Sequence, residues 1–528
     1  MNHFPEMPPP DDAGRRPDFR GSEAELRERA EQWTQSAVFA RLAPHAPAII
    51  SRHGTRTMAQ LHADVNRLAH ALRERGLRPG DGVAIACGNR PEYVEALLAA
   101  LRLGLRVTPI STRLTGAETA WIVSDCQAKV LFVEQGLPAQ GLGVAPEIVI
   151  GSHDYAAELA RGSAEEVADA CAGALMLYTS GTTGRPKGVW SAKADIVPPQ
   201  FGGSFANYQP GDVQLCAGPA YHAAPLLFDL RWPLASGVPI VLLDKWDSTT
   251  VLDAIHHCRV THAHMVPTMF QRLLALPPAE RAARDLHSLR CLMHGAAPCP
   301  VQVKRAMIDW LGPVLLEYYA ATEGGDGIHV RSEDWLARPG TVGRLERSRG
   351  HRILDESGQE VAAGVVGTIY FQAPAEGRFE YFGDPEKTAA AYKDNRFTLG
   401  DLGYVDEDGW LFLTGRCADV VISGGVNLYP AEVDEALMQH PGVEDACTVG
   451  VPDADWGEHL LSVVVPRAPW TGGGELMQSL TQHLEQHLPR LKRPKEIVFE
   501  TALPRTETGK LLRNRVRARF WEGIGRSI

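Results

Sequence analysis

The sequence predicts an α/β protein with a large N-terminal domain and a small C-terminal domain. At 528 residues the chain is too long for one ordinary hydrophobic core. Up to about Thr341, apolar strands alternate with amphipathic helices, which is the pattern of a parallel sheet covered by helices. Beyond that point the segments are short, bounded by turns and rich in β-formers. We therefore expect helix-covered sheets, then a β subdomain, then a small α+β domain.

The alternation starts with an amphipathic helix predicted over residues 58–75, where apolar side chains recur at helical spacing and Gly76 follows as a C-cap. A short apolar segment at 83–86 predicts a buried strand, and residues 93–103 predict a second helix. Further strands of this α/β region are predicted at 107–110, 130–133, 148–150, 175–177, 239–243 and 291–293.

The rest of the chain predicts a β subdomain and a compact terminal unit with a basic tail. Its expected elements are strands at 367–371 and 409–414, then a strand at 420–422, a helix over Pro430–Met438, strands at 443–449 and 461–465, and a further helix. We divide the chain into a flexible lead (1–22), a large domain (23–415) that opens with a charged helix at 23–31, a hinge (416–420) and a small domain (421–528).

Composition narrows the class of protein. A formal net charge of −11 argues against nucleic-acid binding as the main role, because such proteins carry a basic surplus. The nine cysteines include no C-x-x-C pair, which is typical of reduced thiols in a cytoplasmic protein. The acidic, proline-rich start does not resemble a signal peptide, and the apolar run at 94–105 is too short to span a membrane. We expect a cytoplasmic protein without a transmembrane segment, and leave peripheral membrane contact and a homodimer open.

A loop rich in glycine and hydroxyls at 178–189, Y-T-S-G-T-T-G-R-P-K-G-V, is the most informative segment. Glycines let backbone N–H groups approach anionic oxygens closely, the hydroxyls add donors, and Lys187 supplies positive charge. The spacing fails the P-loop pattern, because Pro186 replaces its glycine and Gly188 its magnesium-binding hydroxyl. The loop therefore predicts a polyphosphate cradle outside the P-loop class.

Three further segments carry charges suited to a nucleotide, although each alone has a simpler interpretation. Glu323, beside Thr322 and two glycines, suits Mg²⁺ against a phosphate, or is an acidic loop residue. Asp401 in G-D-L-G-Y suits two ribose hydroxyls, with Arg416 as a nearby cation, or belongs to an Asp-Gly turn. Lys510 in P-R-T-E-T-G-K delivers charge across a domain boundary, or is a solvated surface lysine.

Two other chemistries are disfavoured. The histidines within 256–264 invite a metal site, but flanking apolar residues predict a buried strand, and no four-ligand set has a standard spacing. A serine hydrolase is unsupported because the chain has no G-x-S-x-G turn.

Read together, six motifs resemble those of the adenylate-forming superfamily, which includes acyl-CoA synthetases, nonribosomal adenylation domains and firefly luciferase. The resemblance covers residues 55–513. It departs from the common pattern at Ala320, where glycine is usual, at Leu399, where threonine is frequent, and at Ala418, where lysine is frequent. The motifs occur in the family's order and are Y-T-S-G-T-T-G-R-P-K-G, Y-A-A-T-E, G-D-L-G-Y, G-R-C-A-D, S-G-G-V-N-L-Y-P-A-E-V and P-R-T-E-T-G-K.

The resemblance implies a role for each matching residue. Lys510 would be the adenylation lysine, Thr322 and Glu323 would serve the phosphates, and Glu323 would hold the magnesium ion. His222 would lie at the mouth of the acyl pocket. ATP and AMP would be bound by Thr179, Ser180, Gly181, Thr182, Thr183, Gly184, Lys187, Gly295, Ala296, Ala297, Pro298, Tyr319, Ala320, Asp401 and Arg416.

The resemblance also implies two half-reactions in one active site. A carboxylic acid attacks the α-phosphate of ATP with Mg²⁺ present, giving an acyl-adenylate and pyrophosphate, and the thiol of coenzyme A then displaces AMP. Asp419 would be the hinge about which the small domain rotates between the two steps. Gly424 and Gly425 would line the passage used by coenzyme A after rotation.

The implied activity is that of an AMP-forming acyl-CoA synthetase acting on a small-molecule carboxylic acid. The segments 292–300 and 316–324 resemble synthetases for fatty or bulky, steroid-like acids, while aryl acids stay open. An amino acid is disfavoured because no aspartate lies early in 222–226, although Asp229 follows. Two alternatives remain at this stage: an enzyme that loads a separate carrier protein, and a catalytically silent acyl- or nucleotide-binding relative.

Overall fold

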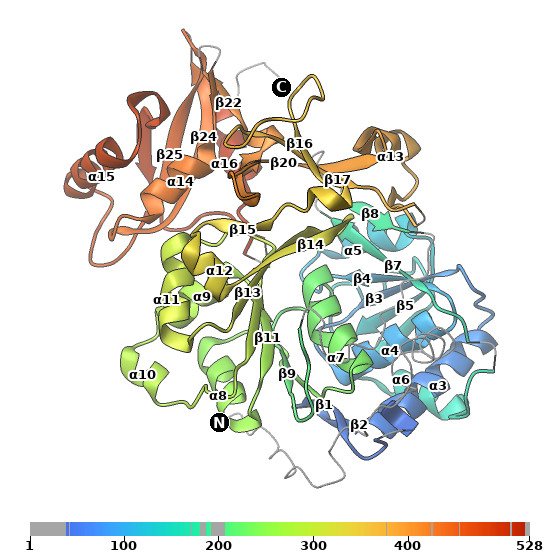
Figure 1. Cartoon of the computed structure of the whole chain (residues 1–528). Helices are drawn as coiled ribbons and strands as arrows, with labels where there is room; N and C mark the ends of the chain where they lie inside the picture. Colours follow the sequence, from blue (N-terminus) through green and yellow to red (C-terminus); the bar gives the residue numbers. More distant parts are fainter. Residues whose placement is uncertain are drawn as a thin grey trace.

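The computed structural model describes residues 39–41, 43–168, 170–179, 186–191, 206–375, 377–423, 426–453, 455–506 and 509–522. The expected lead at 1–22 and the helix expected at 23–31 lie outside these ranges. In the described part, three β-sheets form a large N-terminal region, and a fourth forms a smaller C-terminal region (Figure 1). The α/β class predicted from the sequence is therefore confirmed.

The first sheet has the strand order β18-β8-β7-β4-β3-β5-β6. The strands from β7 to β6 are parallel, and antiparallel β8 and β18 extend the β7 edge. Helices α3, α4 and α6 cover one face and α5 covers the other, which explains the continuous apolar runs of the central strands. The bounds are β3 Gly82–Ala86, β4 Arg106–Ile110, β5 Ala128–Glu134, β6 Glu147–Ile150, β7 Ala174–Thr179, β8 Lys187–Trp190, β18 Glu380–Tyr381, α3 Met58–Glu74, α4 Pro91–Arg102, α5 Gly116–Asp125 and α6 His153–Arg161.

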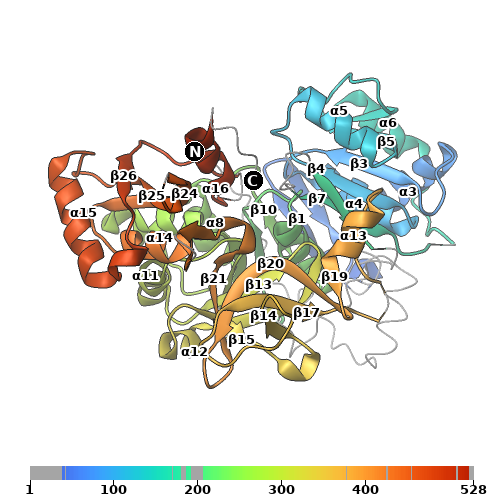
Figure 2. The same cartoon turned by 90° about the horizontal axis from the view of Figure 1, so that it is seen from above.

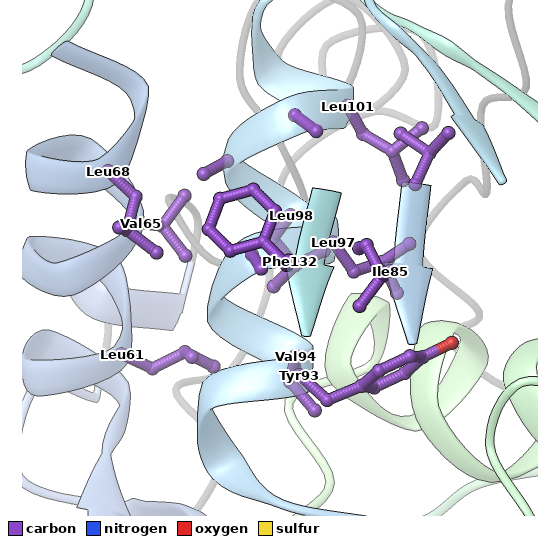
Figure 3. Packing of buried hydrophobic residues seen from close by; sticks show 14 of the residues in the cluster. Leu61, Val65, Leu68, Ile85, Tyr93, Val94, Leu97, Leu98, Leu101 and Phe132 are labelled. Carbon is purple, nitrogen blue, oxygen red and sulfur yellow. The ribbon is translucent and has the colours of Figure 1, made fainter. Parts of the chain in front are cut away.

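The core of this layer lies between α3, α4 and the sheet. Thr57 and Gln60 form a capping box that starts α3, and Gly76 follows its end with φ of 88°, as its C-cap role requires. Figure 3 shows apolar side chains of α3 and α4 meeting Ile85 on β3 and Phe132 on β5. Each such fully buried side chain stabilises the fold by about 1.5–3 kcal/mol.

The second sheet has the order β14-β13-β12-β11-β9-β10-β1-β2. Helices α8, α9 and α11 cover one of its faces. Its histidine-bearing strand β11 is buried, as expected for that segment. The bounds are β1 Pro47–Ser51, β2 Gly54–Thr57, β9 Gln214–Cys216, β10 Ile240–Leu242, β11 His262–Met265, β12 Cys291–His294, β13 Leu315–Ala321, β14 Gly324–Arg331, α8 Ser248–Cys258, α9 Pro267–Leu274, α10 Pro278–Ala282, α11 Val301–Leu311 and α12 Ser332–Ala337.

A π-helix, η2 (Pro225–Arg231), lies between the first two sheets and continues into α7 (Trp232–Ala235). Leu226 and Leu230 of η2 pack into the core of the first layer, while Phe228 packs on β12 and β13 of the second sheet. Such π-helical turns are rare and occur mostly at functional sites. This one follows His222 directly.

The third sheet, β15-β21-β20-β17-β16 with β19 beside β20, forms the predicted β subdomain. The fourth, β23-β22-β25-β24 with β26 beside β25, forms the small region with α14, α15 and α16. The bounds are β15 Thr341–Arg344, β16 Arg352–Leu354, β17 Gly367–Gln372, β19 Tyr392–Lys393, β20 Arg396–Val405, β21 Trp410–Arg416, β22 Val421–Ser423, β23 Val426–Leu428, β24 Val443–Asp453, β25 Gly457–Pro466, β26 Glu496–Phe499, α13 Pro385–Ala391, α14 Pro430–Met438, α15 Gly474–His487, α16 Arg513–Trp521 and the 3-10 turns η3 Arg347–Arg349, η4 Cys417–Asp419 and η5 Arg490–Lys492.

The small region docks on the large one through α11. Figures 1 and 2 both show α14 beside α11, and the Gln302 side chain of α11 donates a hydrogen bond to the Met438 carbonyl at the end of α14. No helix among the described residues is long and apolar enough to cross a membrane.

Candidate functional site

Asp401 and Arg416 lie opposite each other on the paired strands β20 and β21. Arg416 Nε donates to Asp401 Oδ1 at 3.0 Å, and the Tyr319 hydroxyl donates to Oδ2 at 2.7 Å. Each carboxylate oxygen keeps a further lone pair, so Asp401 is held in place and still able to accept two ribose hydroxyls. Burial, together with Asp401, raises the pKa of Tyr319, which keeps its donating proton in place.

The predicted adenine segment, residues 295–298, leaves the end of β12 in a tight turn. A side chain at Gly295 would approach the Tyr318 ring to 2.6 Å, so only glycine fits there. Ala296 has φ of 63°, a left-handed conformation that costs a non-glycine residue of order 1 kcal/mol or more. Local strain of this kind accumulates at ligand sites, which agrees with the role expected for Ala297 and Pro298 beside it.

Thr322 and Glu323 form the two-residue turn that joins β13 to β14. Ala321 pairs with Gly324 across the turn, and Gly324 adopts φ of 119°. The Tyr381 hydroxyl donates to Glu323 Oε1 at 3.3 Å. Glu323 is thus presented at a strand end, three residues after Ala320, the residue that replaces the family's usual glycine.

Lys187 begins β8, with its ammonium 4.7 Å from the centre of the Tyr381 ring. Burial, followed by the like charge of Lys387, lowers the pKa of Lys187 to about 8. Thr179 ends the neighbouring strand β7, and Thr179 and Lys187 are paired. The loop residues Ser180, Gly181, Thr182, Thr183 and Gly184, and the predicted passage residues Gly424 and Gly425, lie outside the described residues.

Lys510 comes from the small region, on a turn that other side chains hold. Arg505 binds both oxygens of Asp445, at 2.6 and 2.9 Å, and donates to the Gly509 carbonyl at 2.6 Å. The Lys510 backbone N–H donates to Thr506 Oγ1 at 3.0 Å. The turn therefore presents Lys510 in one orientation.

Lys510 lies in the electrostatic environment of residues of the large region that are predicted to bind the nucleotide. Burial, followed by the charge of Arg416, lowers the pKa of Lys510 below its ordinary value, while Asp401 and Glu323 act in the opposite direction. Four residues predicted separately along the chain, Lys510, Asp401, Arg416 and Glu323, are thus neighbours in space.

Gly509 fixes how closely this turn approaches the large region. A side chain at Gly509 would meet Thr268 Oγ1, at the start of α9, at 2.2 Å, and Gly509 also has φ of 77°. Only glycine satisfies both constraints.

The predicted hinge residue Asp419 ends the 3-10 turn η4, which directly follows Arg416. Its Oδ2 lies 3.5 Å from Arg513 Nε, and the same guanidinium binds Asp434 at 2.7 Å. Asp419 therefore connects the strand that carries Arg416 to the small region.

His222 lies at the start of the segment that becomes η2, with its ring 4.9 Å from that of Tyr221. Six residues further along the chain, Phe228 of η2 contacts Tyr318 and His264, and His264 Nε2 and the Tyr318 hydroxyl are 3.0 Å apart. Burial lowers the pKa of His264 to about 3, so this histidine is neutral. Ala224, two residues after His222, packs against the apolar and aromatic cluster around Phe228.

Several residues of the site were not found from the sequence. Tyr381, Lys387 and Thr268 belong to no motif that was singled out. Asp384-Pro385 marks a helix start in the sequence, and this places Lys387 in the first turn of α13. The sequence does not show that Lys387 lies near Lys187 of β8, because this depends on the pairing of β18 with β8.

The residues of the candidate site are compatible with a magnesium ion held by a single protein carboxylate, that of Glu323. The described residues include no group of three histidine, cysteine, aspartate or glutamate side chains arranged for a metal ion. Mg²⁺ retains water and takes substrate phosphate oxygens as ligands, so the half-buried carboxylate of Glu323 would be sufficient protein support for it.

Comparisons with known proteins agree with this geometry. The chain matches the AMP-binding enzyme model over residues 37–377 and the AMP-binding enzyme C-terminal domain model over residues 432–510. It is 35% identical to feruloyl-CoA synthase from Amycolatopsis sp over 490 residues, covering 91% of this chain and 97% of the relative. It is 32% identical to a fatty acid–[acyl-carrier-protein] ligase from Streptomyces coeruleorubidus, covering 92% and 95%.

Among solved structures, o-succinylbenzoate CoA synthetase from Bacillus subtilis in complex with its acyl-adenylate intermediate superposes with a TM-score of 0.77 at 27% identity, covering 91% of this chain and 97% of that one. The family models, the full-length relatives and the shared fold lead to one conclusion. The chain belongs to the AMP-binding enzyme family of the adenylate-forming superfamily.

Proposed function

We propose that this chain is an AMP-forming acyl-CoA synthetase that activates a fatty or bulky, steroid-like carboxylic acid with ATP and transfers the acyl group to coenzyme A. The observation that carries the proposal is the position of Lys510 beside Arg416, Asp401 and Glu323. This arrangement supports a role for Lys510, a cation from the small region, in stabilising the charge that develops on phosphate. The acyl-CoA ligases among its relatives support the same reaction class.

In the first half-reaction, a carboxylate oxygen of the acid attacks the α-phosphorus of ATP, and pyrophosphate leaves with the electrons of the broken P–O bond. Asp401 and Arg416 fix the ribose, and Lys510 stabilises the negative charge that grows on the phosphate oxygens. Bound at Glu323, Mg²⁺ would further neutralise phosphate charge.

In the second half-reaction, the sulfur of coenzyme A attacks the acyl carbon, the thiol loses its proton, and AMP departs. We propose that the small region rotates about Asp419 between the two steps. The domain boundaries proposed for this movement are those expected from the sequence: 23–415 for the large domain, 416–420 for the hinge and 421–528 for the small domain. The rotation would withdraw Lys510 and bring the segment with Gly424 and Gly425 to the acyl-adenylate.

Aromatic acids are a second candidate substrate class, favoured by one observation. Phe228, Tyr318 and His264 form a cluster of ring faces and edges that packs against Ala224, two residues after His222, and such clusters suit planar groups. An amino acid is disfavoured, because Asp229 is fully buried, its Oδ1 accepts a hydrogen bond from the Gln214 side chain at 2.7 Å, and burial raises its pKa, which disfavours the charge that would pair with an α-amine.

Pyrophosphate release with a panel of fatty, steroid, aryl and amino acids, with and without coenzyme A, tests the proposal. We expect release with fatty or bulky acids and thioester formation when coenzyme A is added. Release with aryl acids alone would select the second substrate class. Release without a thioester, together with acylation of an added carrier protein, would establish carrier loading, and no release with any acid would indicate a silent relative.

A further inference from the structure

Two lysines from separate elements converge beside Glu323. Lys187 is the first residue of β8, and Lys387 lies in the first turn of α13, where Asp384 caps the helix by accepting its backbone N–H at 3.0 Å. Pairing of Tyr381 with Val189 brings β18, the strand before α13, against β8. Figure 1 shows α13 next to β8. The juxtaposition is therefore set by the sheet and the helix cap.

The two ammonium groups share one aromatic ring. Lys187 Nζ lies 4.7 Å and Lys387 Nζ lies 5.9 Å from the centre of the Tyr381 ring. They are close enough that the charge and hydrogen-bonding contact of Lys387 lower the pKa of Lys187, after burial, the largest cause. Like charges held together in a partly dry place are unfavourable unless an anion joins them.

The carboxylates nearby do not balance this pair. Glu323 and Asp384 both raise the pKa of Lys187, whereas burial, the largest cause, and Lys387 lower it. Asp384 already caps α13, and Glu323 is hydrogen-bonded by Tyr381 and is the residue proposed to hold magnesium. A multiply charged anion beside Glu323 would balance the two lysines where these described carboxylates are already engaged, and a polyphosphate has that chemistry.

We propose that Lys387 is a second polyphosphate-binding lysine, which with Lys187 holds the β- and γ-phosphates of ATP and then the departing pyrophosphate. The proposal rests on the proposed function, since it assigns Lys387 to the same nucleotide site. It adds a binding residue outside the glycine-rich loop and explains why α13 is docked on β8.

The test measures equilibrium binding of inorganic pyrophosphate and of AMP to the full chain, with magnesium and without any acid. We expect Lys387→Met and Lys187→Met each to weaken pyrophosphate binding about 10-fold. Lys387→Met should leave AMP binding unchanged, because AMP lacks the β- and γ-phosphates. Lys393→Met is the matched control, since Lys393 is an exposed lysine on β19, six residues further along the chain. It should bind both ligands as the parent does.

Pyrophosphate binding unchanged in Lys387→Met would overturn the proposal, and so would equal losses for pyrophosphate and AMP, which indicate a merely structural role. Lys387→Arg keeps the charge and should restore binding. The binding test contains no acid, so its result does not depend on the synthetase reaction. If no acid supports pyrophosphate release but Lys387→Met still weakens pyrophosphate binding, the proposed function is rejected and this inference is retained.

The pH dependence gives a second readout. In the parent, MgATP binding should weaken as Lys187 loses its proton near its pKa of about 8. The groups that face Lys187 are Lys387, Tyr381, Glu323 and Asp384, and Lys387→Met removes the only like charge among them. We expect the alkaline loss of binding to move to higher pH in that variant, and an unmoved profile would contradict the pairing.

Discussion

At the scale of single residues, Lys510 is the residue whose proposed role differs most clearly between the two half-reactions. It lies beside Arg416, Asp401 and Glu323, and its turn is fixed by Arg505 and Thr506. In the proposed reaction, a cation held by this turn near the α-phosphate would help the step in which phosphate charge grows, and would contribute nothing comparable to thiol attack.

For Lys510→Ala we expect adenylation to fall at least ~100-fold, about 2.7 kcal/mol of barrier. Pyrophosphate release in single-turnover experiments measures this step. Thioester formation from supplied acyl-adenylate should survive. Equal losses in both half-reactions would show that Lys510 does not act in adenylation alone.

Glu95 gives a prediction for stability against pH. It is fully buried on α4, where it binds Arg56 Nε at 2.9 Å and the Tyr155 hydroxyl at 2.6 Å. Burial raises its pKa from 4.5 to about 7, against the opposing effects of Tyr155 and Arg56. The folded state therefore favours protonated Glu95, so this contribution to stability is complete below about pH 4.5 and is lost as the pH rises through 7.

We expect the melting temperature of the parent to fall more between pH 5 and pH 8 than that of Glu95→Gln, which stays neutral throughout. Thermal unfolding followed by circular dichroism measures the difference. Parallel pH profiles for the two proteins would mean that Glu95 is ionised in the fold across this range.

At the scale of elements, the contact between the Lys510 turn and the start of α9 sets the position of the catalytic cation. For Gly509→Ala we expect adenylation to fall about 10-fold or more, since the new methyl group meets Thr268 at 2.2 Å and φ of 77° disfavours alanine. Thioester formation from acyl-adenylate should change little. The two half-reaction rates provide the measurement.

Two variants separate the clash from backbone strain. Gly409→Ala has a similar φ of 83° but nothing within 4 Å of the added methyl, so it should leave adenylation unchanged. Adding Thr268→Gly to Gly509→Ala should recover the part of the loss caused by the clash. No recovery in the double variant would show that Thr268 is not what limits the approach of Lys510.

The sequence predicted helices and strands well where a local pattern, such as apolar periodicity or a turn residue, was sufficient to identify them. The helix over 58–75 and the buried strands of the first sheet follow from periodicity and turn residues. The π-helix η2 was not predicted, because its apolar run fits an ordinary helix equally well, and packing between two sheets selects its form. The neighbours of Lys387 and Gly509 were not predictable, since strand pairing and domain docking bring them together.

The sequence could predict which residues belong to the candidate site, because these residues occur in recognisable motifs. Asp401 and Arg416 illustrate the limit of that approach: their motifs identified both residues, while the hydrogen bond from Tyr319 depends on how β13 meets β20. Roles for the loop at 180–184 stay predictions.

At the scale of the whole molecule, the two regions contact each other through Gln302 and Met438 as well as Gly509 and Thr268. We expect a short thiol crosslinker between Gln302→Cys and Gln439→Cys, the exposed residue that follows Met438, to preserve adenylation and to lower thioester formation about 100-fold, because rotation is prevented. Exposed Cys171 and Cys417 are first replaced by serine. Half-reaction assays before and after crosslinking measure the effect.

The uncrosslinked double variant is the control and should carry out both steps. Full thioester formation in the crosslinked protein would show that coenzyme A reacts without rotation, and would reject Asp419 as a functional hinge.

The direct succession of Arg416 and the turn that contains Asp419 has a thermodynamic consequence. The residue proposed to hold the ribose and the proposed pivot are three positions apart, so nucleotide occupancy and domain angle are not independent variables. By thermodynamic linkage, if ATP or AMP binds one domain arrangement more tightly, nucleotide binding shifts the equilibrium toward that arrangement. The free energy of this shift equals the difference in nucleotide binding free energy between the two arrangements. Under the proposed rotation, the order of product release would be a property of the same short segment that acts as the hinge.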